Sequence, residues 1–200
     1  MDDKEKIGPV ARWLGHPSVV LVFGVRGSGK SVFLRQIAKT WDAPGKVGIV
    51  DSLNFGDTHT YGDKVWRYPP QNESDLQGFS LLEVDEADQW MPQKHPNRQN
   101  PVLTNLIRRG RHYNLTLAMA TQRPSALCYD AWSLVDHLFV FSLTSDIDLR
   151  RVAEIDYSLR AQRERITYLQ PGQYMHWDRH GAMGRRVSWG VVPKPTDEGK

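Results

Sequence analysis

The sequence predicts an α/β domain with a mostly parallel central sheet flanked by helices, and three observations support this prediction. The 200-residue chain contains five short apolar runs of strand length. Polar residues rarely interrupt these runs, which is typical of strands buried on both faces of a parallel sheet. Most of the segments between them carry apolar residues at helical spacing, the pattern of βαβ units. The five runs are residues 19–23, 46–51, 79–84, 115–122 and 137–143.

The first run leads directly into a glycine-rich loop, Gly24-Val25-Arg26-Gly27-Ser28-Gly29-Lys30-Ser31, with the Gly-x-x-x-x-Gly-Lys-Ser pattern of a phosphate-binding loop. Glycines allow such a loop to curl until successive backbone N–H groups point at phosphate oxygens. After it, apolar residues recur on one helix face, so a helix that begins near Lys30 adds the positive end of its dipole. A turn that binds nothing is the alternative. The predicted nucleotide-binding residues are Gly24, Arg26, Gly27, Ser28, Gly29, Lys30, Ser31 and Val32.

Two adjacent carboxylates, Asp85 and Glu86, end the run at residues 79–84. In proteins with such a loop, an aspartate at the end of a neighbouring strand contacts Mg²⁺, and Ser31 would hold the same ion. Lys30 would reach the β- and γ-phosphates, and Glu86 is placed to orient or deprotonate the attacking water. We therefore predict ATP and Mg²⁺ as cofactors, and hydrolysis rather than binding alone. An acidic helix cap on a solvated edge is the alternative for the acid pair.

Length and composition bound the other possibilities. A chain of 200 residues suits one domain, so a second catalytic domain does not fit. The net charge is only +3, so bulk charge does not by itself indicate nucleic acid. The single cysteine, Cys128, excludes an internal disulfide and suits a buried thiol in a reducing compartment. We expect three segments: a lead-in at residues 1–17, a domain at 18–192 and a polar tail at 193–200. Within the lead-in, Trp13 and Leu14 are expected to pack on the domain edge.

Membrane insertion is not expected, because no apolar run approaches the ~20 residues of a membrane span. The polar, turn-rich segment 52–77 predicts a connection with a short helix near residues 73–77. Within it, His59 lies near Asp57 and Asp63, but loop composition explains these residues better than a metal site does.

The second half of the chain alternates loops, helices and strands in the same manner. Residues 90–101 contain three prolines and predict an exposed loop, and a helix follows with Leu103, Leu106 and Ile107 on one face. One or two arginine-rich helices are expected past Ser145. Two further strands, near residues 172–178 and 186–192, close the predicted domain.

Residues 108–125, with the sequence RRGRHYNLTLAMATQRPS, add a third motif to the loop and the acid pair. This combination resembles the FtsK/HerA superfamily of DNA-pumping ATPases. The matching features are a Walker A motif ending in Gly-Ser-Gly-Lys-Ser, an Asp-Glu Walker B motif and a strand ending in Thr-Gln-Arg-Pro-Ser. The segment Ser145-Asp146-Ile147-Asp148-Leu149-Arg150 and the closing strand pair are similar too. Most of residues 18–192 is covered, and the resemblance implies a RecA-like P-loop NTPase fold.

The resemblance also implies roles for residues outside the loop. Gln122 would be the polar sensor between the sheet and the γ-phosphate, and Arg111 an arginine finger that reaches a neighbouring subunit's nucleotide, with Arg150 as a second candidate. Such a finger stabilises the charge that spreads over the transferring phosphoryl group. One of the neighbouring arginines could instead sit on solvent or on a carboxylate. Fingers between subunits imply a homo-oligomeric ring, a hexamer as in that family.

Within the superfamily, the sequence looks most like the compact genome-packaging ATPases of tailless, membrane-containing double-jelly-roll viruses. The implied partners are double-stranded DNA, read without sequence preference, and capsid or membrane proteins at a packaging vertex. The implied location is the host cytoplasm or that vertex of the virion. Lys94 and Arg98, together with Arg160, Arg163 and Arg165, are candidate contacts to the DNA backbone, although solvated faces or intersubunit ion pairs explain each one equally well. Trp90 fits a core or interface better than a base-stacking role.

Other classes remain to be weighed. A cellular or plasmid HerA/FtsK-like DNA pump would share the motifs, and a nucleotide-gated assembly module that binds ATP with little turnover would share the loop. The letters Asp85-Glu86-Ala87-Asp88 match a DEAD-box helicase, but such helicases need a second RecA-like domain. The Asn-Lys-x-Asp motif of GTPases and the Leu-Ser-Gly-Gly motif of ABC-type ATPases do not occur.

Overall fold

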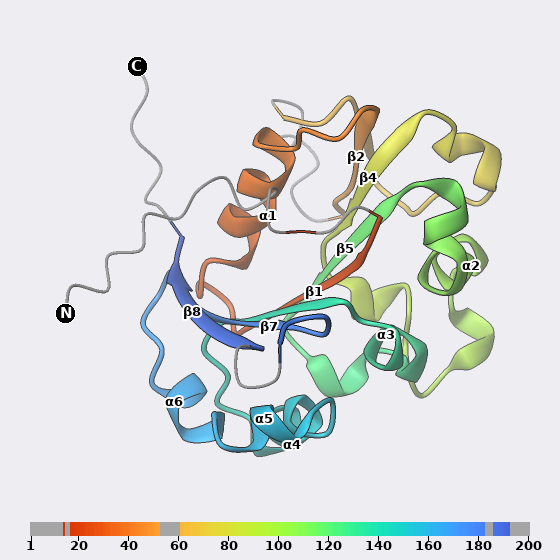
Figure 1. Ribbon diagram of the computed structural model, residues 1–200. Coiled ribbons are helices and arrows are strands. Elements are labelled where there is room, and N and C mark those ends of the chain that lie inside the picture. Colours follow the sequence, from red (N-terminus) through yellow and green to blue (C-terminus); the bar gives the residue numbers. More distant parts are fainter. Residues whose placement is uncertain (1–13, 15–16, 53–60, 183–185, 193–200) are drawn as a thin grey trace.

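A computed structural model describes residues 14, 17–52, 61–182 and 186–192, and these residues form one eight-stranded sheet (Figure 1). The strand order is β3-β2-β4-β5-β1-β6-β7-β8. The first six strands in this order are parallel, and the last two pair antiparallel to their neighbours. The predicted α/β fold class, with a closing strand pair, is therefore confirmed. The strands are β1 (Val19–Phe23), β2 (Lys46–Val50), β3 (Lys64–Trp66), β4 (Phe79–Val84), β5 (Thr116–Thr121), β6 (His137–Val140), β7 (Gln173–Asp178) and β8 (Val187–Val191).

Helices cover both faces of the sheet (Figure 1). Alternate residues of β1 enter two separate apolar clusters, with Leu21 and Phe23 in one and Val20 and Val22 in the other. The first cluster includes residues of α2 and α3, and the second includes the buried face of α1. The helices are α1 (Lys30–Lys39), α2 (Pro101–Arg109), α3 (Tyr129–Ser133), α4 (Asp146–Ala153), α5 (Tyr157–Arg160) and α6 (Arg163–Thr167). Short 3₁₀ turns are η3 (Glu73–Leu76), η4 (Ala87–Gln89), η5 (Pro96–Arg98), η6 (Gly110–Tyr113) and η7 (Pro124–Ala126).

Local sequence signals explain where several helices begin. At the start of α2, the Asn100 side chain accepts a hydrogen bond of 2.9 Å from the backbone N–H of Leu103, and Pro101 follows the cap. At the start of α4, Ser145 accepts from the N–H of Asp148. The predicted apolar face of α2 is confirmed, because Leu103, Leu106 and Ile107 are all buried.

The structure differs from the sequence prediction in two segments. The connection at residues 52–77 contains a strand, β3, that was not predicted, because three residues are too few to show a period. Its pairing with β2 at the edge of the sheet supports it instead. The short helix expected near residues 73–77 is present as η3. Past Ser145 the structure contains three short helices, α4 to α6, rather than one or two.

Some predictions fall outside the described residues: Trp13 and most of the lead-in, the tail at 193–200, and Asp57 and His59. Leu14, at the end of the lead-in, is buried against the α1 face of the sheet. Cys128 is buried as expected, and burial raises the pKa of its thiol. In the part of the chain that the structure describes, no helix is both long and apolar enough to span a bilayer.

Candidate nucleotide-binding site

The glycine-rich loop connects the carboxyl end of β1 to the first turn of α1, as the motif requires. Its backbone needs glycine at particular positions. Gly27 and Gly29 have φ angles of 76° and 112°, which side-chain-bearing residues rarely adopt. A Cβ on Gly24 would lie only 2.6 Å from the Cβ of Phe141, on the strand side of the loop. The loop therefore keeps an open, curled backbone at the positive end of a ten-residue helix.

Lys30, the first residue of α1, is folded back under this loop. Its ammonium donates to the backbone oxygens of Gly24 at 2.8 Å and Val25 at 3.1 Å, and only 6% of the residue is exposed. Burial lowers the pKa of Lys30, while the nearby carboxylates of Asp85 and Glu86 act in the opposite direction. The lysine is thus held beside the acid pair by the curl of its own loop.

Ser31 and Asp85 bring two oxygen ligands together from different elements. Asp85 directly follows β4, and the Ser31 hydroxyl donates to its Oδ2 at 3.3 Å. Burial raises the pKa of Asp85, and hydrogen bonds from the backbone N–H of Glu86 and from Ser31 oppose that rise. A hydroxyl and a carboxylate at this spacing are the hard oxygen ligands that Mg²⁺ prefers, so the residues fit the predicted ion.

Glu86 and Gln122 meet across the ends of two neighbouring strands. The Gln122 side chain, just past β5, donates its Nε2–H to Oε1 of Glu86. Glu86 adopts a left-handed backbone conformation with φ of 51°, which is rare for a residue other than glycine and is characteristic of functional sites. Burial raises the pKa of its carboxyl group, as suits a base that works near neutral pH.

A second contact fixes the turn that carries Glu86. Thr121, the last residue of β5, donates its hydroxyl to Oδ1 of Asp88 at 2.6 Å. Together the two contacts tie the acid turn after β4 to the end of β5. Sequence reasoning did not single out Asp88, although it lies in the acidic run that follows the strand.

Two further acids lie near this edge of the sheet and were not predicted as site residues. Asp51 follows β2, whose neighbour in the sheet is β4, and Glu83 lies inside β4; both line a small cavity together with Ser31 and Asp85. Glu83 is only 1% exposed, and burial raises the pKa of its carboxyl group well above the usual value. The sequence did hold a signal for each, an acid directly after one apolar strand and an acid within another.

Neither predicted arginine finger pairs with the acids of this site. Arg111 pairs with Asp136 at 3.0 Å, and Asp136 accepts from the backbone N–H of Val19 at the beginning of β1. Arg111 is therefore at the amino end of the sheet, whereas the loop follows the carboxyl end of β1. Arg150 lies on α4 and forms an exposed pair with Asp146 at 2.5 Å. Both guanidiniums are therefore paired with carboxylates that do not belong to this site.

The predicted DNA contacts are spread over two surfaces. Lys94 and Arg98 are exposed around η5. On the other surface, Arg163 pairs with Asp146 and Arg165 stacks on the Trp189 ring with its guanidinium carbon 3.7 Å from the ring centre. Arg160 lies over the ring of the exposed Tyr157. Trp90 packs partly buried against the core, in agreement with the structural role expected for it.

Comparisons with known proteins show the fold. No protein-family model matches the chain, and no curated protein matches it in sequence. The genome packaging NTPase B204 of Sulfolobus turreted icosahedral virus 2, solved with sulfate, superposes with a TM-score of 0.69 at 18% identity, covering 88% of this chain and 96% of that one. B204 of Sulfolobus turreted icosahedral virus, described as a DNA-packaging ATPase, gives 0.68 at 16% identity, covering 89% and 99%.

A third neighbour is the cytoplasmic domain of the type VII secretion ATPase EccC from Thermomonospora curvata, with a TM-score of 0.58 at 15% identity. This chain is covered to 90% and spans 24% of EccC. The mostly parallel sheet flanked by helices is therefore the RecA-like P-loop NTPase fold. These neighbours agree with the resemblance to packaging ATPases that the motifs indicated.

Proposed function

We propose that this protein is an ATPase whose site lies at the carboxyl ends of β1, β4 and β5. One observation carries the proposal. Three strands, separated by long stretches of sequence, deliver the Lys30 loop, the Ser31–Asp85 pair and the Glu86–Gln122 pair to the same edge of the sheet. This is the set of groups that phosphoryl transfer to water requires. B204 of Sulfolobus turreted icosahedral virus 2 has been solved with ATP-gammaS, which supports ATP as the nucleotide here.

Each residue then has a role in that chemistry. The loop N–H groups and Lys30 bind the phosphates, and Ser31 and Asp85 would hold Mg²⁺, which neutralises charge on the β- and γ-phosphates when bound. Glu86 accepts the proton of the attacking water. Gln122 orients the Glu86 carboxylate and senses the state of the γ-phosphate.

We further propose that hydrolysis drives translocation of double-stranded DNA by a homohexameric ring, in the packaging of a viral genome. Both B204 proteins are packaging enzymes of viruses, which supports a packaging role here. The position of Arg111 supports a ring, because an arginine at the amino end of the sheet can serve only the nucleotide of another subunit. Working locations in the host cytoplasm or at a capsid vertex, and the domain limits 18–192, belong to the same proposal.

The discriminating experiment is the ATPase rate with and without double-stranded DNA of several sequences, with the mass of the complex measured in the same samples. For a translocase we expect the mass of a multi-subunit ring and an ATPase rate that increases when double-stranded DNA of any sequence is added. ATP binding with negligible turnover, unchanged by DNA, would instead support a nucleotide-gated assembly module. A cellular DNA pump would give the same biochemical result as a packaging motor, and capture of the ring by purified capsid proteins separates these two.

A further inference from the structure

Asp136 is a buried carboxylate on which several segments of the chain converge at the amino end of the sheet. It directly precedes β6 and is 5% exposed. Its Oδ2 accepts from the backbone N–H of Val19 at 2.9 Å, and its own N–H donates to the Val19 oxygen at 2.9 Å. The carboxylate is thus fixed to the first residue of β1, the strand that carries the phosphate-binding loop at its other end.

The other oxygen of this carboxylate faces outward. Oδ1 of Asp136 lies 3.0 Å from Nη2 of Arg111 and 3.0 Å from Nε2 of His180. The Arg111 side chain is 69% exposed, so one nitrogen of its guanidinium is anchored while much of the group remains open to solvent. A planar guanidinium offers several donors in a fixed fork, and it can therefore hold a carboxylate on one side and an oxyanion on another.

The pairing of Arg111 contrasts with that of Arg150. The Arg150–Asp146 pair joins two exposed side chains, 68% and 57% accessible, and Asp146 is shared with Arg163. Pairs of this kind on a surface fix little, because both partners move and water screens them. Asp136 is instead immobilised by β1 and β6. Of the two predicted fingers, Arg111 is the one with a rigid support.

The surroundings of Arg111 suit an incoming anion. It borders a cavity of about 270 Å³ to which Arg108, Arg109 and Arg179 also contribute, and Asp136 is its acidic lining residue. Ser18 lines the same cavity with a buried hydroxyl that has no hydrogen-bond partner. Arg108 is already paired with Asp130, and Arg179 donates to backbone oxygens, so the open face of Arg111 and the Ser18 hydroxyl are the donors offered to an oxyanion.

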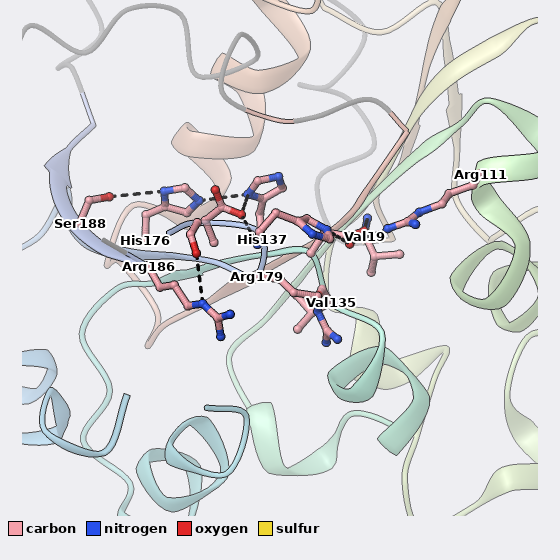
Figure 2. A network of polar contacts seen from close by, with 12 residues as sticks. Val19, Arg111, Val135, His137, His176, Arg179, Arg186 and Ser188 are labelled. Carbon is pink, nitrogen blue, oxygen red and sulfur yellow. Dashed lines mark hydrogen bonds and ion pairs between the residues drawn. The ribbon is translucent and has the colours of Figure 1, made fainter. Parts of the chain in front are cut away.

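We propose that Asp136 is a positioning residue that holds Arg111 in the pose from which it contacts the transferring phosphoryl group of a neighbouring subunit. The inference rests on the proposed function, in which Arg111 acts between subunits. The turn after β7 shares the support, because His180 uses the same carboxylate oxygen and the N–H of Arg179 donates to the Asp136 backbone oxygen. Figure 2 shows the Arg111 side chain extending toward Val19 and the Arg179 guanidinium beside Val135, to whose backbone oxygen it donates.

Complementation between two inactive subunits tests the proposal. Lys30→Ala subunits cannot use their own nucleotide but keep Arg111, and Arg111→Ala subunits keep the nucleotide site but cannot serve a neighbour. Mixed complexes of the two should recover turnover. When the donor subunit is Lys30→Ala/Asp136→Asn, we expect the recovered kcat to fall about 100-fold, the cost of displacing a catalytic group by ~1 Å, with KM for ATP unchanged.

The matched control donor is Lys30→Ala/Asp146→Asn, which makes the same chemical change at the exposed partner of Arg150 and should recover turnover fully. If the simple Lys30→Ala donor recovers no turnover although the measured mass shows mixed complexes, Arg111 does not act between subunits. The positioning role of Asp136 then falls with it. Full recovery with the Asp136→Asn donor overturns the positioning role alone and leaves the proposed function standing.

A second variant guards against misfolding of Asp136→Asn, which melting temperature would reveal. Arg111→Lys at an exposed position keeps the charge but lacks the fork that joins Asp136 to a phosphate. Donors that carry it should recover turnover as poorly as Asp136→Asn donors, and a fully active lysine donor contradicts the proposal. In complexes of one variant alone, adding Asp136→Asn to Arg111→Ala should lower the residual turnover no further, whereas a purely structural role for Asp136 predicts a further loss.

Discussion

Replacing Glu86 by Gln should separate ATP binding from hydrolysis. Glutamine has the shape of glutamate and keeps an oxygen that accepts from Nε2 of Gln122, so the contact between the two strands survives. The amide cannot accept a proton from water. Because a positioned general base contributes about 10²–10⁴ in rate, and each tenfold corresponds to about 1.4 kcal/mol, the barrier should rise by about 3–5 kcal/mol.

The assay pairs single-turnover hydrolysis with the affinity for a fluorescent ATP analogue. The affinity should stay at the wild-type value, because the loop and Lys30 are untouched, while the rate falls by two to four orders of magnitude, as expected for loss of a general base. The wild-type rate should also fall as the pH drops through the raised pKa of Glu86, because protonation removes the base. That acidic limb should be absent in Glu86→Gln.

Glu83→Gln is the matched control. This residue lies inside β4, three positions before Glu86, and its Oε1 is buried without a hydrogen-bond partner rather than bonded to Gln122. Turnover should therefore stay within the wild-type order of magnitude. A Glu86→Gln enzyme that hydrolyses ATP at the wild-type rate refutes the assignment of the base, and an equal loss in both variants would mean that the strand, not the base, was disturbed.

Three further outcomes follow from the structure. Gly29→Ala should lower the free energy of unfolding by about 1–3 kcal/mol and weaken ATP binding, because φ of residue 29 is 112° and the new Cβ would lie 3.3 Å from the Gly172 backbone. The control Gly78→Ala, where φ is 80° and a Cβ would meet nothing within 4 Å, should show the stability loss in urea unfolding but normal ATP affinity. Ser31→Ala should raise the Mg²⁺ concentration needed for half-maximal turnover by about tenfold or more, as measured by titrating Mg²⁺ against the ATPase rate. Removing Mg²⁺ with a chelator should stop turnover, and adding the ion back should restore it. Burial lowers the pKa of His176 from 6.5 to about 4, so the unfolded chain binds a proton before the folded one does, and urea unfolding should show stability falling by up to about 3 kcal/mol as the pH drops from about 6.5 to about 4. Burial also lowers the pKa of the neighbouring His137, so His176→Gln should weaken this dependence without abolishing it.

The nucleotide site could be predicted because its parts are local in sequence. A glycine-rich loop after one apolar run and an acid pair after another need no knowledge of strand order, since the carboxyl ends of parallel strands meet at one edge. The family resemblance, and not this rule, singled out Gln122, which the structure places beside Glu86 because β5 pairs with β4. The rule applied equally to Asp51, which was missed because a single acid after a strand is a weaker signal than a pair. The catalytic roles of these residues remain predictions until the variants are measured.

The surroundings of Arg111 could not be predicted. Its partner Asp136 is 25 residues away along the chain, and the contact depends on the placement of β6 beside β1, which no local pattern encodes. An arginine in a basic run gives no sign of whether it will meet a carboxylate or solvent. For the same reason β3 escaped prediction, because pairing with β2 creates it and its own three residues do not.

Under the proposed role of Arg111, the two ends of β1 link function to assembly. The phosphate-binding loop follows one end, and the Asp136–Arg111 pair is hydrogen-bonded to the other, where Val19 begins the strand. Five residues of strand separate them by roughly 16 Å, and the strand is rigid because it lies in the middle of the sheet. No side-chain rearrangement within one subunit can bring that guanidinium to its own loop. Under the proposed role of Arg111, a single copy lacks the guanidinium that its own nucleotide needs, and the rate of hydrolysis per subunit should rise with protein concentration as subunits assemble.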